Sequence, residues 1–225
     1  MPSLRDLARL DAAVLDLDGT LVDSVYAHVV AWRRAFLEVG VDVPAWQVHG
    51  AIGLGGDRLV THVAGEATEE AVGDAVRKLH ERHFEDLLPQ VTALPGASEL
   101  IDVLRGLGMQ VTVASSGGEQ MTNRQLDLID ARDLLHGWVA GTHVEETKPA
   151  PDLLDEALAR LSADRALVVG DTVWDIRTAT ARDCPGVGLL TGGIDAERLL
   201  QAGAVSVHDT PAALAAAFED VAGPA

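Results

Sequence analysis

Four short apolar segments, rich in β-forming residues, recur along this chain, and helical patterns separate most of them. The segments span residues 12–17, 110–115, 166–170 and 186–190, and a weaker one spans 204–207. Near-continuous apolar strands that alternate with amphipathic helices are typical of a parallel sheet covered on both faces. The sequence therefore predicts an α/β fold with a doubly wound parallel sheet.

The region between the first two segments interrupts this alternation, because it holds helical patterns and no convincing strand. Helices are predicted over residues 25–39, 57–64 and 68–88. A run of helices between the first strand and the rest of a sheet indicates an inserted cap. We therefore expect an all-α cap over residues 22–93 and a core domain formed by residues 1–21 and 94–225.

The net charge and the composition of the chain limit the kinds of molecule that it is expected to bind. The 225 residues carry a formal net charge of −18 and no basic patch suited to a phosphate backbone, so we expect no nucleic-acid partner. No apolar run approaches transmembrane length, and the single cysteine, Cys184, fits a reducing compartment. We expect a cytoplasmic protein without a membrane partner, as a monomer or a homodimer.

The first apolar segment ends in two carboxylates, within Asp16-Leu17-Asp18-Gly19-Thr20. Side chains two residues apart on a strand point the same way, so Asp16 and Asp18 are expected to converge on one site, where such a pair attracts a divalent cation. Gly19 permits a tight turn, and Thr20 supplies a hydroxyl beside whatever binds there. The alternative interpretation is a surface turn rich in Asp and Gly.

Three further features follow later segments, at the strand ends where open α/β sheets place their ligand sites. Ser115 and Ser116 precede two glycines, an arrangement suited to binding anionic oxygens, although small residues after a strand are common. Lys148 stands just before a proline-initiated helix, either within reach of a phosphoryl group or simply exposed. Asp171 and Asp175 follow the third segment, and the plainer interpretation makes them a turn residue and a helix cap.

Together, these motifs resemble the four motifs of the haloacid dehalogenase superfamily, in its phosphatase and phosphomutase branch. They are Asp-x-Asp-Gly-Thr, a serine at a strand end, Lys-Pro-x-Pro-Asp and Gly-Asp-Thr-x-x-Asp, in the order and spacing of that superfamily. The resemblance covers essentially the whole chain. It implies a Rossmann-like core with a helical cap inserted after the first motif.

The resemblance implies catalytic roles for Asp16, Asp18 and Lys148. Asp16 would be the nucleophile that forms an aspartyl-phosphate, and Asp18 would first protonate the leaving alkoxide and then deprotonate water. Mg²⁺ would be bound by the Asp16 carboxylate, the Asp18 backbone carbonyl and Asp171. Lys148 would compensate the charge of the phosphate, and Asp175 would orient Lys148 or a metal-bound water.

The resemblance also suggests contacts to the substrate. Ser115 is favoured as the contact of the phosphoryl group, with Ser116 close to the substrate, although the choice between the two serines stays open. His28 has the offset from the first motif of a cap histidine in β-phosphoglucomutases, or it is a plain helix-face residue. Arg58 follows the glycine loop 53–56 and is a candidate anchor for the distal group of the substrate, or the loop has no ligand role.

These implications favour one activity over two alternatives. The leading expectation is a Mg²⁺-dependent phosphatase of the phosphoglycolate phosphatase type, which hydrolyses a small organic phosphate monoester. A sugar phosphomutase of the β-phosphoglucomutase type differs because it transfers the phosphoryl group to a sugar phosphate instead of water. A catalytically silent binding or regulatory module is the alternative from another class, although all four motif acids and the lysine are present.

Overall fold

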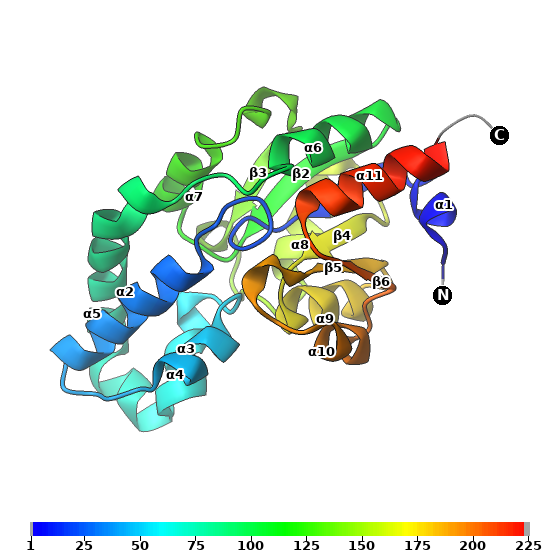
Figure 1. Ribbon diagram of the computed structural model, residues 1–225. Helices are drawn as coiled ribbons and strands as arrows, with labels where there is room; N and C mark the ends of the chain where they lie inside the picture. The colour runs from blue at the N-terminus through cyan, green and yellow to red at the C-terminus, as the bar shows by residue number, and fades with distance from the viewer. Residues whose placement is uncertain (1, 223–225) are drawn as a thin grey trace.

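Within residues 2–222, which the computed structural model describes, six parallel strands form one sheet in the order β3-β2-β1-β4-β5-β6 (Figure 1). The strands are β1 (Ala12–Leu15), β2 (Gln110–Ser115), β3 (Trp138–Ala140), β4 (Leu167–Gly170), β5 (Gly186–Leu189) and β6 (Ser206–His208). Helices pack on both faces of the sheet (Figure 1). The predicted α/β fold with a doubly wound parallel sheet is therefore confirmed.

The helices of the described residues lie before, between and after these strands. The α-helices are α1 (Leu4–Leu7), α2 (Val25–Glu38), α3 (Ala45–Ala51), α4 (Gly56–Ala64), α5 (Glu66–Leu87), α6 (Ala97–Gly106), α7 (Glu119–Leu126), α8 (Asp152–Leu161), α9 (Val173–Ala181), α10 (Ala196–Ala202) and α11 (Pro211–Ala222). The 3-10 helices are η1 (Leu88–Gln90), η2 (Arg132–Leu134), η3 (Gly141–His143) and η4 (Leu190–Gly192). None of the helices in this part of the chain has both the length and the apolar character that crossing a bilayer requires.

Predicted and observed elements agree best where the apolar pattern is strongest. β1, β2, β4 and β5 lie within the four predicted segments, and β6 overlaps the weaker fifth segment. The sequence does not predict β3, because three residues at the edge of a sheet carry too little pattern to indicate a strand. The short helices α3 and α7 are not predicted either.

The central strand β1 is buried on both faces. Ala13 and Leu15 pack into the apolar cluster that includes α6 and α11, whereas Ala12 and Val14 pack into the cluster that includes α8. Because both faces contact apolar side chains, the sequence of β1 is continuously apolar instead of alternating. This packing holds the strand in place and thereby fixes the position of Asp16, the residue that follows it.

The segment between β1 and η1 contains α2, α3, α4 and α5, which share a hydrophobic cluster of their own. The long helices α2 and α5 lie side by side (Figure 1). The two connections to the core also run together: the Asp23 N–H donates to the Thr92 carbonyl at 2.9 Å. The Leu94 N–H donates to the Leu21 carbonyl at 2.8 Å. These features support a cap over residues 22–93, and the boundaries of the two domains stay a prediction.

Gly96 precedes α6 at the point where α11 approaches it. Its φ of +85° favours glycine, and a Cβ at this position would collide with the backbone of Ala212. We expect Gly96→Ala to lower the free energy of unfolding by about 2–4 kcal/mol, through left-handed strain and overpacking. Gly108→Ala is the matched control: Gly108 has a φ of +88° and open space around it. The control should lose only about 1 kcal/mol in urea denaturation, and equal losses would contradict this explanation.

Candidate active site

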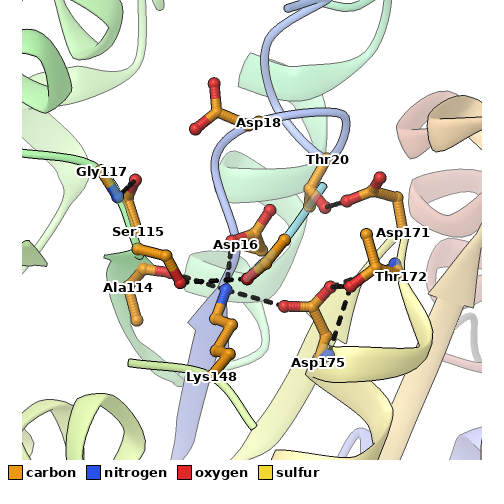
Figure 2. A network of polar contacts seen from close by, with 12 residues as sticks. Asp16, Asp18, Thr20, Ala114, Ser115, Gly117, Lys148, Asp171, Thr172 and Asp175 are labelled. Atoms are coloured by element: carbon orange, nitrogen blue, oxygen red, sulfur yellow. Dashed lines mark hydrogen bonds and ion pairs between the residues drawn. The ribbon is translucent and has the colours of Figure 1, made fainter. Parts of the chain in front are cut away.

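Four charged side chains gather at the carboxyl end of the central strands (Figure 2). Asp16 follows β1, Asp171 follows β4, Asp175 lies in the first turn of α9, and Lys148 comes from the loop before α8. Because β1 and β4 are neighbours in the sheet, the residues that follow them are held side by side. All four side chains are buried, so the fold places a cluster of charges inside the protein.

This cluster contains more negative than positive charge. One carboxylate oxygen from each of Asp16, Asp171 and Asp175 lies within 4.8 Å of the other two. Lys148 Nζ donates to an Asp16 oxygen, lies 2.7 Å from Asp175 Oδ1 and donates to the Ala114 carbonyl at 3.2 Å. Three carboxylates around one ammonium leave an excess of two negative charges when all are ionised, which a divalent cation would balance.

Burial shifts the proton equilibria of these groups. Burial raises the pKa of Asp16 to about 7; the Lys148 charge opposes this shift, and the Asp175 charge adds to it. The pKa of Asp171 is raised well above its usual range by burial and by the charge of Asp16. Burial lowers the pKa of Lys148, but the charges of Asp16 and Asp175 outweigh burial and raise it. The ammonium therefore stays charged, and the carboxylates need a further cation to ionise together.

The surroundings of Asp171 fit a metal ligand. Its Oδ1 accepts a hydrogen bond from the Thr20 hydroxyl at 3.1 Å, whereas its buried Oδ2 has no hydrogen-bond partner within residues 2–222. Gly19 and Gly192 enclose this carboxylate so closely that a Cβ at either position would collide with it. A buried oxygen without a donor, beside two further carboxylates, suits Mg²⁺. The hydroxyl of Thr20, which we expected beside the bound group, contacts Asp171, and its role toward a ligand stays a prediction.

Asp175 has two structural roles. Its Oδ2 accepts hydrogen bonds from the Thr172 N–H at 3.0 Å and from the Thr172 hydroxyl at 2.6 Å, in a capping box at the start of α9. Its Oδ1 faces Lys148. The helix-cap interpretation is therefore confirmed, and the same cap fixes the orientation of the carboxylate that contacts Lys148.

Asp18 turns its carboxylate away from the other acids (Figure 2). Its Oδ1 accepts hydrogen bonds from Ser24 Oγ at 2.5 Å and Gln125 Nε2 at 2.5 Å, and His28 Nε2 lies 3.0 Å away. Burial raises the pKa of Asp18, but the His28 charge and the three hydrogen bonds outweigh burial and hold it well below its usual range. Asp16 and Asp18 line one cavity, yet their carboxylates diverge because β1 ends before the first of them.

Ser115 and Ser116 have different surroundings. Ser115 is fully buried, and its Oγ accepts a hydrogen bond from the Gly117 N–H at 3.0 Å. Ser116 lines the cavity, and its Oγ donates to the Gly53 carbonyl at 3.1 Å. Ser116 thus links the core to the cap loop, and the preference for Ser115 at the phosphoryl group stays a prediction.

Of the two cap residues that we singled out, His28 lines the cavity and Arg58 does not. His28 Nε2 faces Asp18, and its Nδ1 lies 3.0 Å from His80 Nε2. Arg58 Nη2 donates to Glu146 Oε2 of the core at 2.5 Å. The structure thus pairs Arg58 with an acid of the core, and its role as an anchor for the substrate stays a prediction.

A cavity of about 70 Å³ lies between the cap and the core. Its lining comprises Asp16, Asp18, Ser116 and Gly117 from the core, and His28, Trp32, Ile52, Leu54, His80 and the glycines 53, 55 and 56 from the cap. Beside it, Trp174 packs against apolar clusters of both cap and core. Sequence reasoning did not identify Trp32, His80 or Gln125, because each is an ordinary helix residue until the fold brings it to this site.

A family model, curated relatives and a solved structure all relate this chain to hydrolases. Residues 13–188 match a family model described as haloacid dehalogenase-like hydrolase. A phosphoglycolate phosphatase of Cupriavidus necator is 32% identical over 181 residues, which cover 77% of this chain and 78% of the relative. A validoxylamine A 7′-phosphate phosphatase of Streptomyces hygroscopicus is 28% identical, over 84% of this chain and 90% of the relative. The crystal structure of a hydrolase from Pseudomonas syringae shares 33% identity and a TM-score of 0.87, covering 94% of this chain and 99% of the other.

The acidic cluster predicts a stabilising effect of Mg²⁺ that depends on pH. Folding raises the pKa of Asp16 to about 7, so the metal-free protein loses stability as pH rises from the usual carboxyl range through this value. Because Mg²⁺ binds ionised carboxylates, it should raise the Tm more at about pH 8 than at about pH 5. Differential scanning fluorimetry measures this difference, with Asp171→Asn as the control that loses it. An equal shift at both pH values, or one that survives in Asp171→Asn, would contradict the site.

Proposed function

The chain belongs to the haloacid dehalogenase-like hydrolase family, and on this premise we propose that it is a Mg²⁺-dependent phosphatase of small organic phosphate monoesters. The observation that carries the proposal is the buried pair of Asp16 and Lys148 beside Asp171 and Asp175. A carboxylate nucleophile next to a fixed cation suits attack on a phosphoryl group. Relatives named for two different phosphate esters support the type of reaction and leave the substrate open.

In the first step, an Asp16 oxygen attacks the phosphorus atom, the bond from phosphorus to the ester oxygen breaks, and an aspartyl-phosphate forms. The departing alkoxide takes a proton from Asp18. Lys148, which contacts Asp16, stabilises the negative charge on the phosphoryl oxygens. Asp175 is a positioning residue here, because its capped carboxylate holds Lys148 in place.

In the second step, water attacks the phosphorus, its proton passes to Asp18, and the bond between Asp16 and phosphorus breaks to release phosphate. The hydrogen bonds to Asp18 lower its pKa, so in this arrangement it is the ionised base that the second step needs. The first step needs its acid form. We therefore expect Asp18 to give up part of this hydrogen-bond set when the substrate binds.

Asp16, Asp171 and the Asp18 backbone carbonyl would hold the Mg²⁺ ion, with the Asp175 carboxylate beside them. When bound, the ion offsets the repulsion between these carboxylates and a dianionic phosphate ester. The need for a divalent cation follows from the residues of the chain, because Lys148 alone does not balance the charge of the acids that surround it.

Asp16→Asn tests the nucleophile. The amide is nearly isosteric with the carboxylate but does not attack phosphorus, so hydrolysis of p-nitrophenyl phosphate with Mg²⁺ should fall at least about 10³-fold. The exposed Asp23 lies outside the cavity lining, and Asp23→Asn is the matched control with wild-type activity. Circular dichroism checks that both variants fold, and normal turnover by a folded Asp16→Asn would refute the mechanism.

Asp18→Asn tests the acid and base roles. We expect turnover to fall at least about 10²-fold, and phosphorylated protein to accumulate when the leaving group is p-nitrophenolate, which departs without a proton. Intact-protein mass spectrometry after rapid acid quenching detects the added phosphoryl group. Turnover at the wild-type rate would exclude these roles. Isomerisation of a sugar phosphate by the wild-type protein, without phosphate release, would favour the phosphomutase alternative.

A further inference from the structure

The cavity beyond Asp16 is where the alcohol part of a phosphate ester has to lie. On its cap side, three apolar residues, Trp32, Ile52 and Leu54, line it. Its polar side chains are the two acids, two histidines and Ser116. Among the described residues that line this cavity there is no lysine and no arginine.

The two arginines that adjoin the glycine loop are already paired with acids. Arg58 Nη2 lies 2.5 Å from Glu146 Oε2, and neither residue lines the cavity. Arg77 donates to the Glu69 carboxylate at 2.8 and 2.9 Å and to Asp74 at 2.7 Å. Arg77 also donates to the Gly56 carbonyl at 3.0 Å and is absent from the cavity lining. Both guanidinium groups are thus engaged by acids, and neither lines the cavity.

The two histidines do not replace these cations. His80 stacks on Trp32 with 3.9 Å between ring centroids, and burial holds the pKa of its imidazole well below the ordinary value, so it is neutral. His28 is directed at Asp18, which balances any charge that His28 carries. The 3.0 Å contact between His28 Nδ1 and His80 Nε2 also occupies one nitrogen of each ring. Apart from the two acids and His28, which faces one of them, the polar groups of the cavity lining are therefore neutral.

We propose that the natural substrate is the phosphate ester of a small uncharged alcohol with an apolar face, such as a polyol or a cyclic alcohol. The inference rests on the proposed phosphatase function. A second anionic group, whether a carboxylate as in 2-phosphoglycolate or another phosphate, would lie in a cavity whose lining contributes two acids and neither lysine nor arginine. Burying an unpaired charge is strongly unfavourable, and the net charge of −18 adds long-range repulsion.

A matched pair of esters tests this directly. 2-Hydroxyethyl phosphate and 2-phosphoglycolate have the same heavy-atom skeleton apart from one oxygen, and they differ by a hydroxymethyl group in place of a carboxylate. With the wild-type protein and Mg²⁺, we expect kcat/KM to be at least about tenfold higher for 2-hydroxyethyl phosphate. p-Nitrophenyl phosphate serves as the reporter of general phosphatase activity.

Leu54 offers a variant that supplies the missing charge. Leu54→Lys places an ammonium in the cavity wall, and Leu54→Met is the matched control of similar length without charge. We expect the ratio of kcat/KM for 2-phosphoglycolate to that for 2-hydroxyethyl phosphate to rise at least about tenfold in Leu54→Lys and to stay near the wild-type ratio in Leu54→Met. Because each comparison is a ratio within one variant, a partial loss of folded protein does not affect it.

The outcomes separate the two proposals. If the wild-type protein hydrolyses 2-phosphoglycolate as fast as the neutral ester or faster, the substrate class is wrong and the phosphatase function stands. If it releases phosphate from none of the three esters, both proposals fail. Preference for the neutral ester, with a ratio that moves only in Leu54→Lys, supports the inference.

Discussion

One buried ammonium, that of Lys148, holds the charged edge of this sheet together. It contacts Asp16 after the central strand and Asp175 in the first turn of α9. A buried charge is tolerated only when it is paired, and removal of one partner leaves the other uncompensated. The capping box ties the second oxygen of Asp175 to Thr172, so the ion pair and the start of α9 depend on one another. The site is therefore as rigid as the elements that carry it.

The core and the cap contribute different chemistry to the same cavity. The core supplies carboxylates and one ammonium, whereas the cap supplies an indole, aliphatic side chains and imidazoles. The contact between them lies beside the charged cluster: the Thr147 hydroxyl, next to Lys148, donates to Asp57 of α4 at 2.5 Å and accepts from the Gly55 N–H at 3.0 Å. Movement of the cap would therefore displace or break contacts of the loop that carries Lys148.

This division explains how one reaction serves several substrates. Relatives named for phosphoglycolate and for validoxylamine A 7′-phosphate share 32% and 28% identity with this chain over most of its length. In the proposed mechanism, the charged cluster acts on the phosphoryl group, which every such ester has in common. The cap lines the space for the alcohol, and in this chain that lining is neutral apart from the two acids of the first motif and His28 paired with one of them.

The sequence by itself determined the α/β class, four of the strands and the motifs that end them. Apolar patterns, and charged residues that follow a strand, can be recognised from residues that are close together in the sequence. The sequence indicated Lys148, Asp171 and Asp175 as site candidates for the same reason. Only the tertiary structure decided which atoms meet. Gln125 reaches Asp18 across 107 residues, and Arg58 turns to Glu146 across 88 residues. Contacts of this kind depend on how elements pack, and no pattern among neighbouring residues records them.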